Sequence, residues 1–161
     1  MTEQRIYFMQ HGLAVDKTVD SERPLSDAGT RETQIMAEAL RSSDAPLSRI
    51  FHSGKLRAQQ TAEIVASAMD ISTIEVANGL SPNDDVKMLA AELSNDDALY
   101  VGHLPHLEKL VSLLTSGHEN PAVLHFKNSA IVYLEKDKTP DQAAPWRIHW
   151  YLTPNSPGIA K

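Results

Sequence analysis

Cysteine is absent from this chain, and several other features are scarce. Without cysteine the chain forms no disulfide bonds and offers no thiolate ligand to a metal. No hydrophobic run approaches the roughly 18 residues that a membrane-spanning helix needs, and residues 1–4 do not open a signal peptide. Basic tracts are missing and the formal net charge is −6, which argues against general nucleic-acid binding. We therefore expect a cytoplasmic protein without membrane or nucleic-acid partners.

The rest of the composition is ordinary for a globular protein. Hydrophobic residues make up 42% of the 161 residues and charged residues 22%. A chain of this length can bury a sizeable core, and it contains no internal repeat or linker-like tract. We predict a single domain over residues 1–161. The small size and the lack of an apolar stripe beyond the core-facing helix positions favour a monomer.

Short apolar runs alternate with amphipathic segments along most of the chain. Strands are predicted at residues 6–9, 49–53, 72–76 and 98–102, and helices at residues 26–43, around 61–68, 86–93 and 107–114. Three more strands, at residues 122–126, 130–135 and 146–152, follow without a long helix, and residues 136–145 are predicted to be a loop. This order is typical of an α/β fold with a mostly parallel sheet and an antiparallel portion.

Three of the predicted strands end at or lead to side chains that can bind phosphate or act as a nucleophile. The first ends at His11, the second leads to Arg57, and the fourth ends at His103. Because the carboxyl ends of parallel strands share one edge of a sheet, two imidazoles and a guanidinium can converge there. Arginine and helix N-termini both favour phosphate, and a neutral histidine is a nucleophile that can accept a phosphoryl group. A strand-end histidine is more often merely hydrogen-bonded, but the residues around His11 favour the functional interpretation.

Five segments of the chain match one family pattern in the right order. They are Gln10-His11-Gly12, Arg23-Pro24-Leu25-Ser26-Asp27-Ala28-Gly29, the run from Ser53 to Ala62, Val101-Gly102-His103-Leu104-Pro105, and Asn128-Ser129-Ala130. The chain thereby resembles the histidine phosphatase superfamily over nearly its whole length, and within it the small SixA-type phosphohistidine phosphatases. The resemblance implies a phosphoglycerate mutase-like fold, a three-layer α/β/α sandwich.

The resemblance also implies a mechanism without a metal or cofactor. His11 would attack phosphorus and become phosphohistidine, and water would then hydrolyse that intermediate. His103 and Arg57 would stabilise the equatorial oxygens. The remaining substrate contacts implied by the family pattern are Gln10, Gly12, Arg23 and Ser129. Ser53 is expected to cap the following helix rather than to touch the ligand.

No general acid stands out in the sequence. Glu32, Asp16, Asp20, Asp84 and Asp85 are candidates by proximity only. An imidazole leaves more easily than an alkoxide, so a pocket poor in acids favours phosphohistidine in a protein as the substrate. A small phosphate ester is the alternative. A mutase role is least expected, because the chain lacks room for the family's substrate-covering insertion.

Position 10 departs from the family pattern. Gln10 replaces an arginine, which removes one charge and a bidentate fork. Losing such a contact costs about 2–4 kcal/mol, or roughly 10²- to 10³-fold in rate. The chain is then either a slower enzyme or a phospho-ligand-binding pseudophosphatase, and retention of His11, Arg57 and His103 favours the enzyme. His106 could pair with His103 on a metal, but without a carboxylate or thiolate partner we expect no metal site.

Overall fold

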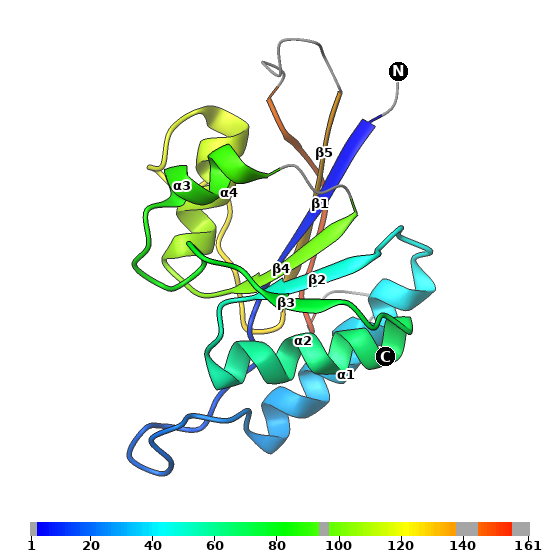
Figure 1. Ribbon diagram of the computed structural model, residues 1–161, viewed down its shortest axis with the longest axis vertical. Coiled ribbons are helices and arrows are strands. Elements are labelled where there is room, and N and C mark those ends of the chain that lie inside the picture. Colours follow the sequence, from blue (N-terminus) through cyan, green and yellow to red (C-terminus); the bar gives the residue numbers. More distant parts are fainter. Residues whose placement is uncertain (1–2, 94–96, 138–144, 156–161) are drawn as a thin grey trace.

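A mixed sheet with helices on both faces forms the framework of the protein (Figure 1). The computed structural model describes residues 3–93, 97–137 and 145–155. The strands are β1 (Glu3–Gln10), β2 (Arg49–His52), β3 (Ile74–Val76), β4 (Ala98–Gly102), β5 (Ile131–Asp137) and β6 (Arg147–Leu152). The helices are α1 (Asp27–Ser42), α2 (Leu56–Met69), α3 (Val86–Glu92) and α4 (His106–Ser116). No helix in these described ranges is long and apolar enough to cross a membrane.

The six strands are ordered β3-β2-β4-β1-β5-β6. The pairs β2–β3, β2–β4 and β1–β4 are parallel, whereas β5 runs antiparallel to both β1 and β6. Gln10 is in register with Gly102, and His52 is in register with Val101. The ends of β1, β2 and β4 therefore meet at one edge of the sheet. The predicted mostly parallel sheet with an antiparallel portion is confirmed.

Side chains alternate along the central strands between two hydrophobic cores. Ile6 and Phe8 of β1 pack with α3 and α4, whereas Tyr7 and Met9 pack with α1 and α2. All four side chains are completely buried. Burying a large apolar side chain stabilises a fold by about 1.5–3 kcal/mol, so β1 ties the two layers of helices to the sheet. The predicted three-layer α/β/α sandwich is confirmed (Figure 1).

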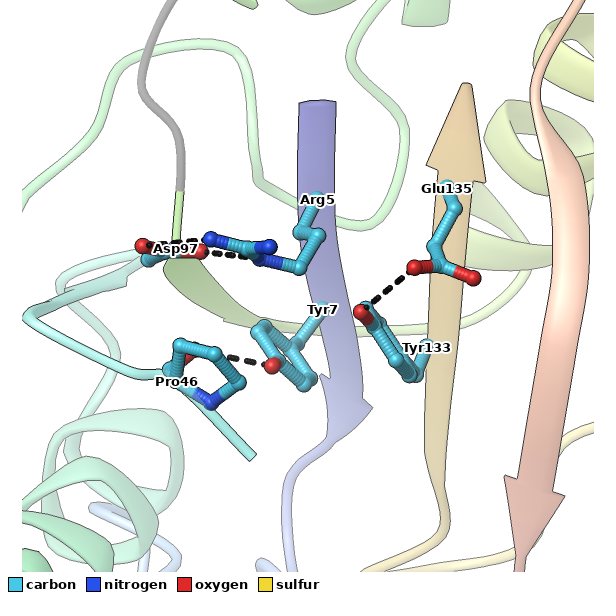
Figure 2. A network of polar contacts seen from close by, with 6 residues as sticks. All are labelled: Arg5, Tyr7, Pro46, Asp97, Tyr133 and Glu135. Atoms are coloured by element: carbon cyan, nitrogen blue, oxygen red, sulfur yellow. Dashed lines mark hydrogen bonds and ion pairs between the residues drawn. The ribbon is translucent and has the colours of Figure 1, made fainter. Parts of the chain in front are cut away.

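Polar contacts stabilise the sheet near the start of β1, at the edge opposite to the carboxyl ends of β1, β2 and β4 (Figure 2). The Arg5 guanidinium lies 2.7 Å from the Asp97 carboxylate, just before β4. The Tyr7 hydroxyl donates to the Pro46 carbonyl at 2.8 Å, and the Tyr7 and Tyr133 rings stack with centroids 4.6 Å apart. These contacts hold β1 in register with β4 and β5, and so help to set where β1 ends.

The strand predicted over residues 122–126 is wrong. Val123 N–H donates to the Ser112 hydroxyl at 3.0 Å, and Phe126 N–H donates to the Glu108 carboxylate at 2.9 Å. Backbone groups that bond side chains of α4 have no need of a neighbouring strand. The segment is therefore a loop across α4, anchored by the buried Phe126 ring. Of the loop predicted over residues 136–145, the first two residues belong to β5, and residues 138–144 lie outside the described part.

Candidate active site

The structure brings His11, His103 and Arg57 together at the carboxyl edge of the sheet. His11 follows β1 and His103 follows β4, and their ring centroids are 4.9 Å apart. Arg57 lies in the first turn of α2, and its Nε–H donates to His11 Nε2 at 3.4 Å. Side chains from two other elements, His103 and Arg57, thus converge on the imidazole of His11.

The His11 ring is held in one tautomer. Its Nδ1 lies 2.6 Å from the Gly12 carbonyl oxygen, which can only accept, so Nδ1 carries the proton. Nε2 then keeps a lone pair, which faces Arg57. Burial lowers the pKa of His11 to about 4, helped by the nearby charges of Arg57 and Arg23 and opposed by the Gly12 bond. At neutral pH the ring is therefore uncharged and nucleophilic at Nε2.

The backbone beside His11 is fixed by bonds from every side. His11 N–H donates to the Gly102 carbonyl at 3.0 Å, and Asn128 Nδ2 donates to the His11 carbonyl at 3.2 Å. Gly12 N–H donates to the Thr61 hydroxyl at 2.9 Å, which itself donates to the Arg57 carbonyl at 2.8 Å. Thr61 thereby links the His11 turn to the helix that carries Arg57. The sequence pattern places Thr61 in the helix predicted around residues 61–68 and gives no signal of this role.

Gly12 has no room for a side chain. A Cβ at this position would lie 2.5 Å from the Thr33 hydroxyl and 3.1 Å from the Gly29 carbonyl. The Thr33 hydroxyl in turn shares a 2.9 Å hydrogen bond with Ser129 Oγ. Ser129 is completely buried at a φ of 66°, and its N–H donates to the Gln10 carbonyl at 3.1 Å. The structure thus places Ser129 behind the His11 turn, with its hydroxyl already bonded.

The second imidazole is buried more deeply than the first. His103 is 1% exposed, and its Nε2 lies 2.6 Å from Ser53 Oγ. Burial, followed by the neighbouring His11 and Arg57, lowers the pKa of His103 to about 3. Ser53 does not cap α2 as predicted: the helix begins at Leu56 and its N-cap is Lys55, without a side-chain bond. The β2–α2 turn carries Ser53 to the imidazole instead.

Comparisons with known proteins identify the family of this chain. Residues 6–81 match the model of the histidine phosphatase superfamily (branch 1). The chain is 32% identical over 165 residues to the phosphohistidine phosphatase SixA of Escherichia coli K12, covering 98% of each chain. This chain belongs to the histidine phosphatase superfamily.

Solved structures share the fold of this chain. A structure of the protein histidine phosphatase SixA in complex with tungstate is 30% identical, with a TM-score of 0.80 over 93% of this chain and 97% of its own. A mycobacterial glucosyl-3-phosphoglycerate phosphatase has the same fold at 15% identity, with a TM-score of 0.73 over 92% of this chain and 98% of its own. The family model and the two SixA relatives support a phosphatase.

Gln10 occupies the position of the arginine in the superfamily pattern. It is 9% exposed, and its N–H donates to the Ala130 carbonyl at 3.2 Å. Its side-chain Oε1 is buried without a hydrogen-bond partner. A buried polar atom without a partner costs about 1–3 kcal/mol, and such atoms are typical of sites awaiting water or ligand.

Arg23 reaches the site from the loop between β1 and α1. An isolated bridge between Ala14 and Leu25 closes this loop, and Arg23 Nε donates to the Val15 carbonyl at 3.1 Å. Arg23 has a φ of 50°, in the left-handed region that non-glycine residues rarely occupy. Its charge contributes to lowering the pKa of both His11 and Arg57, so a second guanidinium acts electrostatically on these two side chains.

Four of the five carboxylates predicted as acid candidates accept hydrogen bonds from nearby residues of the chain, and the fifth, Glu32, lies on α1. Asp16 accepts two bonds from Thr18, at 2.9 and 2.7 Å, and these bonds lower the pKa of Asp16. Three other carboxylates each accept a hydrogen bond from a backbone N–H: Asp20 from Glu22, Asp84 from Ser81 and Asp85 from Lys87. Within the described residues no carboxylate bonds His11, Arg57 or His103. The same residues contain no group of three or more side chains suited to a metal.

Proposed function

We propose that this chain is a metal-independent phosphatase that forms a phosphohistidine on His11 and acts on phosphohistidine in a protein. The observation that carries this proposal is the state of His11. Its Nδ1–H is bound to the Gly12 carbonyl at 2.6 Å, and its unprotonated Nε2 accepts a 3.4 Å hydrogen bond from the Arg57 guanidinium. A neutral, oriented imidazole beside a fixed cation is the arrangement that in-line attack on a phosphoryl group requires.

The reaction takes two displacements at phosphorus. First, His11 Nε2 forms a bond to phosphorus while the bond to the leaving group breaks, and the leaving group departs with that electron pair. Arg57, Arg23 and the second imidazole, His103, stabilise the charge on the three equatorial oxygens. Water then attacks the phosphohistidine, the bond to Nε2 breaks, and a water proton passes to the inorganic phosphate. Gly12 keeps its bond to Nδ1–H throughout and orients the ring.

The absence of a site-bonded carboxylate among the described residues favours a leaving group that needs little protonation. The imidazole of a substrate phosphohistidine is such a group, and a sugar alkoxide is not. The name of the Escherichia coli relative, a phosphohistidine phosphatase, agrees with this choice. We also propose that residues 1–161 act as one domain and as a monomer in the cytoplasm, with a phosphohistidine-bearing protein as partner.

Two alternatives make different predictions. A phosphatase for small phosphate esters would hydrolyse p-nitrophenyl phosphate faster than a phosphohistidine protein. A pseudophosphatase, favoured by the loss of arginine at Gln10, would bind inorganic phosphate or tungstate without ever forming phospho-His11.

A single assay separates these possibilities. We would measure phosphate release from a phosphohistidine protein and from p-nitrophenyl phosphate, with and without EDTA, for the wild type, His11→Ala and His118→Ala. His118 is an exposed histidine on the loop after α4 and serves as the matched control. We expect turnover that EDTA does not affect, that His11→Ala abolishes and that His118→Ala leaves intact. Alkaline quenching of the wild type during turnover should trap phosphate on His11. Turnover by His11→Ala would refute the proposed nucleophile.

A further inference from the structure

We propose that Ser53 is a positioning residue: its hydroxyl donates to His103 Nε2 and so keeps the proton of that imidazole on Nδ1, where it can bond a phosphoryl oxygen. This inference rests on the proposed function, because it assigns a role to a residue beside the same site. The contact that suggests it is the 2.6 Å distance between Ser53 Oγ and His103 Nε2. The distance is short even for a hydroxyl bonded to a ring nitrogen.

His103 has only one ring proton to place. It is 1% exposed, and burial lowers its pKa to about 3, so the ring is neutral at physiological pH. A neutral imidazole donates from one nitrogen and accepts at the other. A serine hydroxyl can do either, so the direction of the Ser53 bond decides which His103 nitrogen carries the proton. That direction in turn decides whether His103 Nδ1 is a protonated hydrogen-bond donor or an unprotonated acceptor.

The local backbone favours Ser53 as the donor. Lys55 N–H donates to Ser53 Oγ at 3.3 Å, which occupies one lone pair of the oxygen and polarises its O–H bond. The turn that makes this contact is well defined, because Gly54 N–H donates to His52 Nδ1 at 3.0 Å and Gly54 adopts a φ of 94°. The Lys55 bond leaves the hydroxyl proton of Ser53 available, and His103 Nε2 lies within hydrogen-bond distance to accept it.

The other nitrogen of His103 has no partner. Nδ1 is buried without a hydrogen bond, as is Gln10 Oε1 on the neighbouring strand end. The His103 ring centroid lies 4.9 Å from that of His11, so the second ring stands beside the imidazole that would carry the phosphoryl group in the proposed mechanism. A phosphoryl oxygen would accept a bond from an Nδ1–H but would be repelled by an Nδ1 lone pair. The tautomer set by Ser53 is therefore the one suited to an anionic ligand.

The tautomer can be observed without measuring activity. In the full chain labelled with ¹⁵N-histidine, the ¹⁵N shifts of His103 at pH 7 should show a protonated Nδ1 and an unprotonated Nε2. Ser53→Ala should move the proton to Nε2 in part or in full, whereas Ser53→Thr, which keeps the hydroxyl, should preserve the wild-type pattern. Addition of inorganic phosphate should perturb the Nδ1–H signal in the wild type. A protonated Nε2 in the wild type would overturn the proposal.

Kinetics provide a second readout. Loss of one well-placed donor to a charged oxygen lowers kcat roughly 10- to 100-fold. We expect Ser53→Ala to lose that much with a smaller change in KM, and Ser53→Thr to recover most of it. Ser43→Ala, at the C-terminus of α1, is the matched control and should behave as the wild type.

A wild-type kcat and tautomer in Ser53→Ala would refute the role of Ser53. If Ser53→Ala does not fold, the NMR result for the wild type and Ser53→Thr still decides the question. The proposed function fails separately, if no phosphate is ever found on His11.

Discussion

Substituting the missing arginine, Gln10→Arg, is the most informative perturbation of this site. Gln10 is 9% exposed at the end of β1, beside His11, and its Oε1 has no partner. An arginine here would add a third guanidinium to Arg23 and Arg57, and it would replace an amide dipole by a full charge with a bidentate fork. The substitution therefore tests whether charge at this position limits the rate.

Two opposing contributions determine how much Gln10→Arg should change kcat/KM. In the transition state, a preorganised cation contributes about 2–4 kcal/mol, so kcat/KM should rise roughly 10²- to 10³-fold. In the empty site, the new cation is buried beside Arg57, whose pKa burial and Arg23 already lower, so repulsion offsets part of the gain. We therefore expect an increase of at least about 10-fold, together with a lower Tm in phosphate-free buffer.

Inorganic phosphate should restore the Tm that Gln10→Arg loses in phosphate-free buffer. A ligand that binds only the folded state raises the Tm, and it does so more for a variant that binds it more tightly. We would compare kcat/KM on a phosphohistidine protein and the phosphate-dependent Tm of the wild type, Gln10→Arg and Gln34→Arg. Gln34 is exposed on α1, so its substitution adds the same charge away from the site and should change neither quantity.

A folded Gln10→Arg with unchanged kcat/KM and unchanged phosphate affinity would refute the reasoning, because it would mean that charge at position 10 does not reach the phosphoryl group. Activity that appears only in Gln10→Arg, with none in the wild type, would instead identify this chain as a pseudophosphatase.

Three further predictions follow from the geometry around His11. Gly12→Ala should destabilise the fold by about 1–3 kcal/mol in urea titration, because its Cβ would lie 2.5 Å from the Thr33 hydroxyl; wild-type stability would refute that contact. Thr61→Val, compared with Thr61→Ser, should lose about 1–3 kcal/mol and most of kcat, since it removes the acceptor for Gly12 N–H; equal behaviour of the two variants would contradict this role. In a pH series with p-nitrophenyl phosphate, kcat/KM should fall only as pH drops through about 4, where His11 becomes protonated; a limb near 6.5 would refute the lowered pKa of His11. The free energy of unfolding should fall with pH in the same direction, because His11 binds a proton more readily in the unfolded chain than in the folded one. The stability that neutral His11 contributes is complete above about pH 6.5 and declines as the pH falls toward 4, which a falling urea midpoint would show.

Local sequence rules predicted the elements whose hydrogen bonds and apolar pattern lie within a short segment of the chain. Ser26, where the helix predicted over residues 26–43 begins, caps α1 by accepting from Gly29 N–H at 3.0 Å. The apolar run at β1 and the helical spacing in α2 also predicted elements that the structure contains. The same rules failed for residues 122–126, because the partners of that backbone, Ser112 and Glu108, lie on a separate helix.

For the site, the motifs predicted which residues meet but not how they bond. That His11, Arg57 and His103 would share one edge follows from strand polarity, which the order of strands and helices makes predictable. The contact between Ser53 and His103, and the bond between Thr33 and Ser129, join residues 50 and 96 positions apart. No spacing in the sequence reports such pairs, since they depend on how neighbouring elements pack.

The sequence by itself determined the alternation of strands and helices, the residues that stand at the strand ends and the glutamine where the family pattern has arginine. These are local facts, set by side-chain chemistry and periodicity. Only the tertiary structure decided that His11 keeps its lone pair on Nε2, that its pKa falls to about 4, and that Ser129 is already bonded behind the turn. Tautomer, pKa and bonding depend on burial and on partners brought from other elements, and the folded packing alone supplies both.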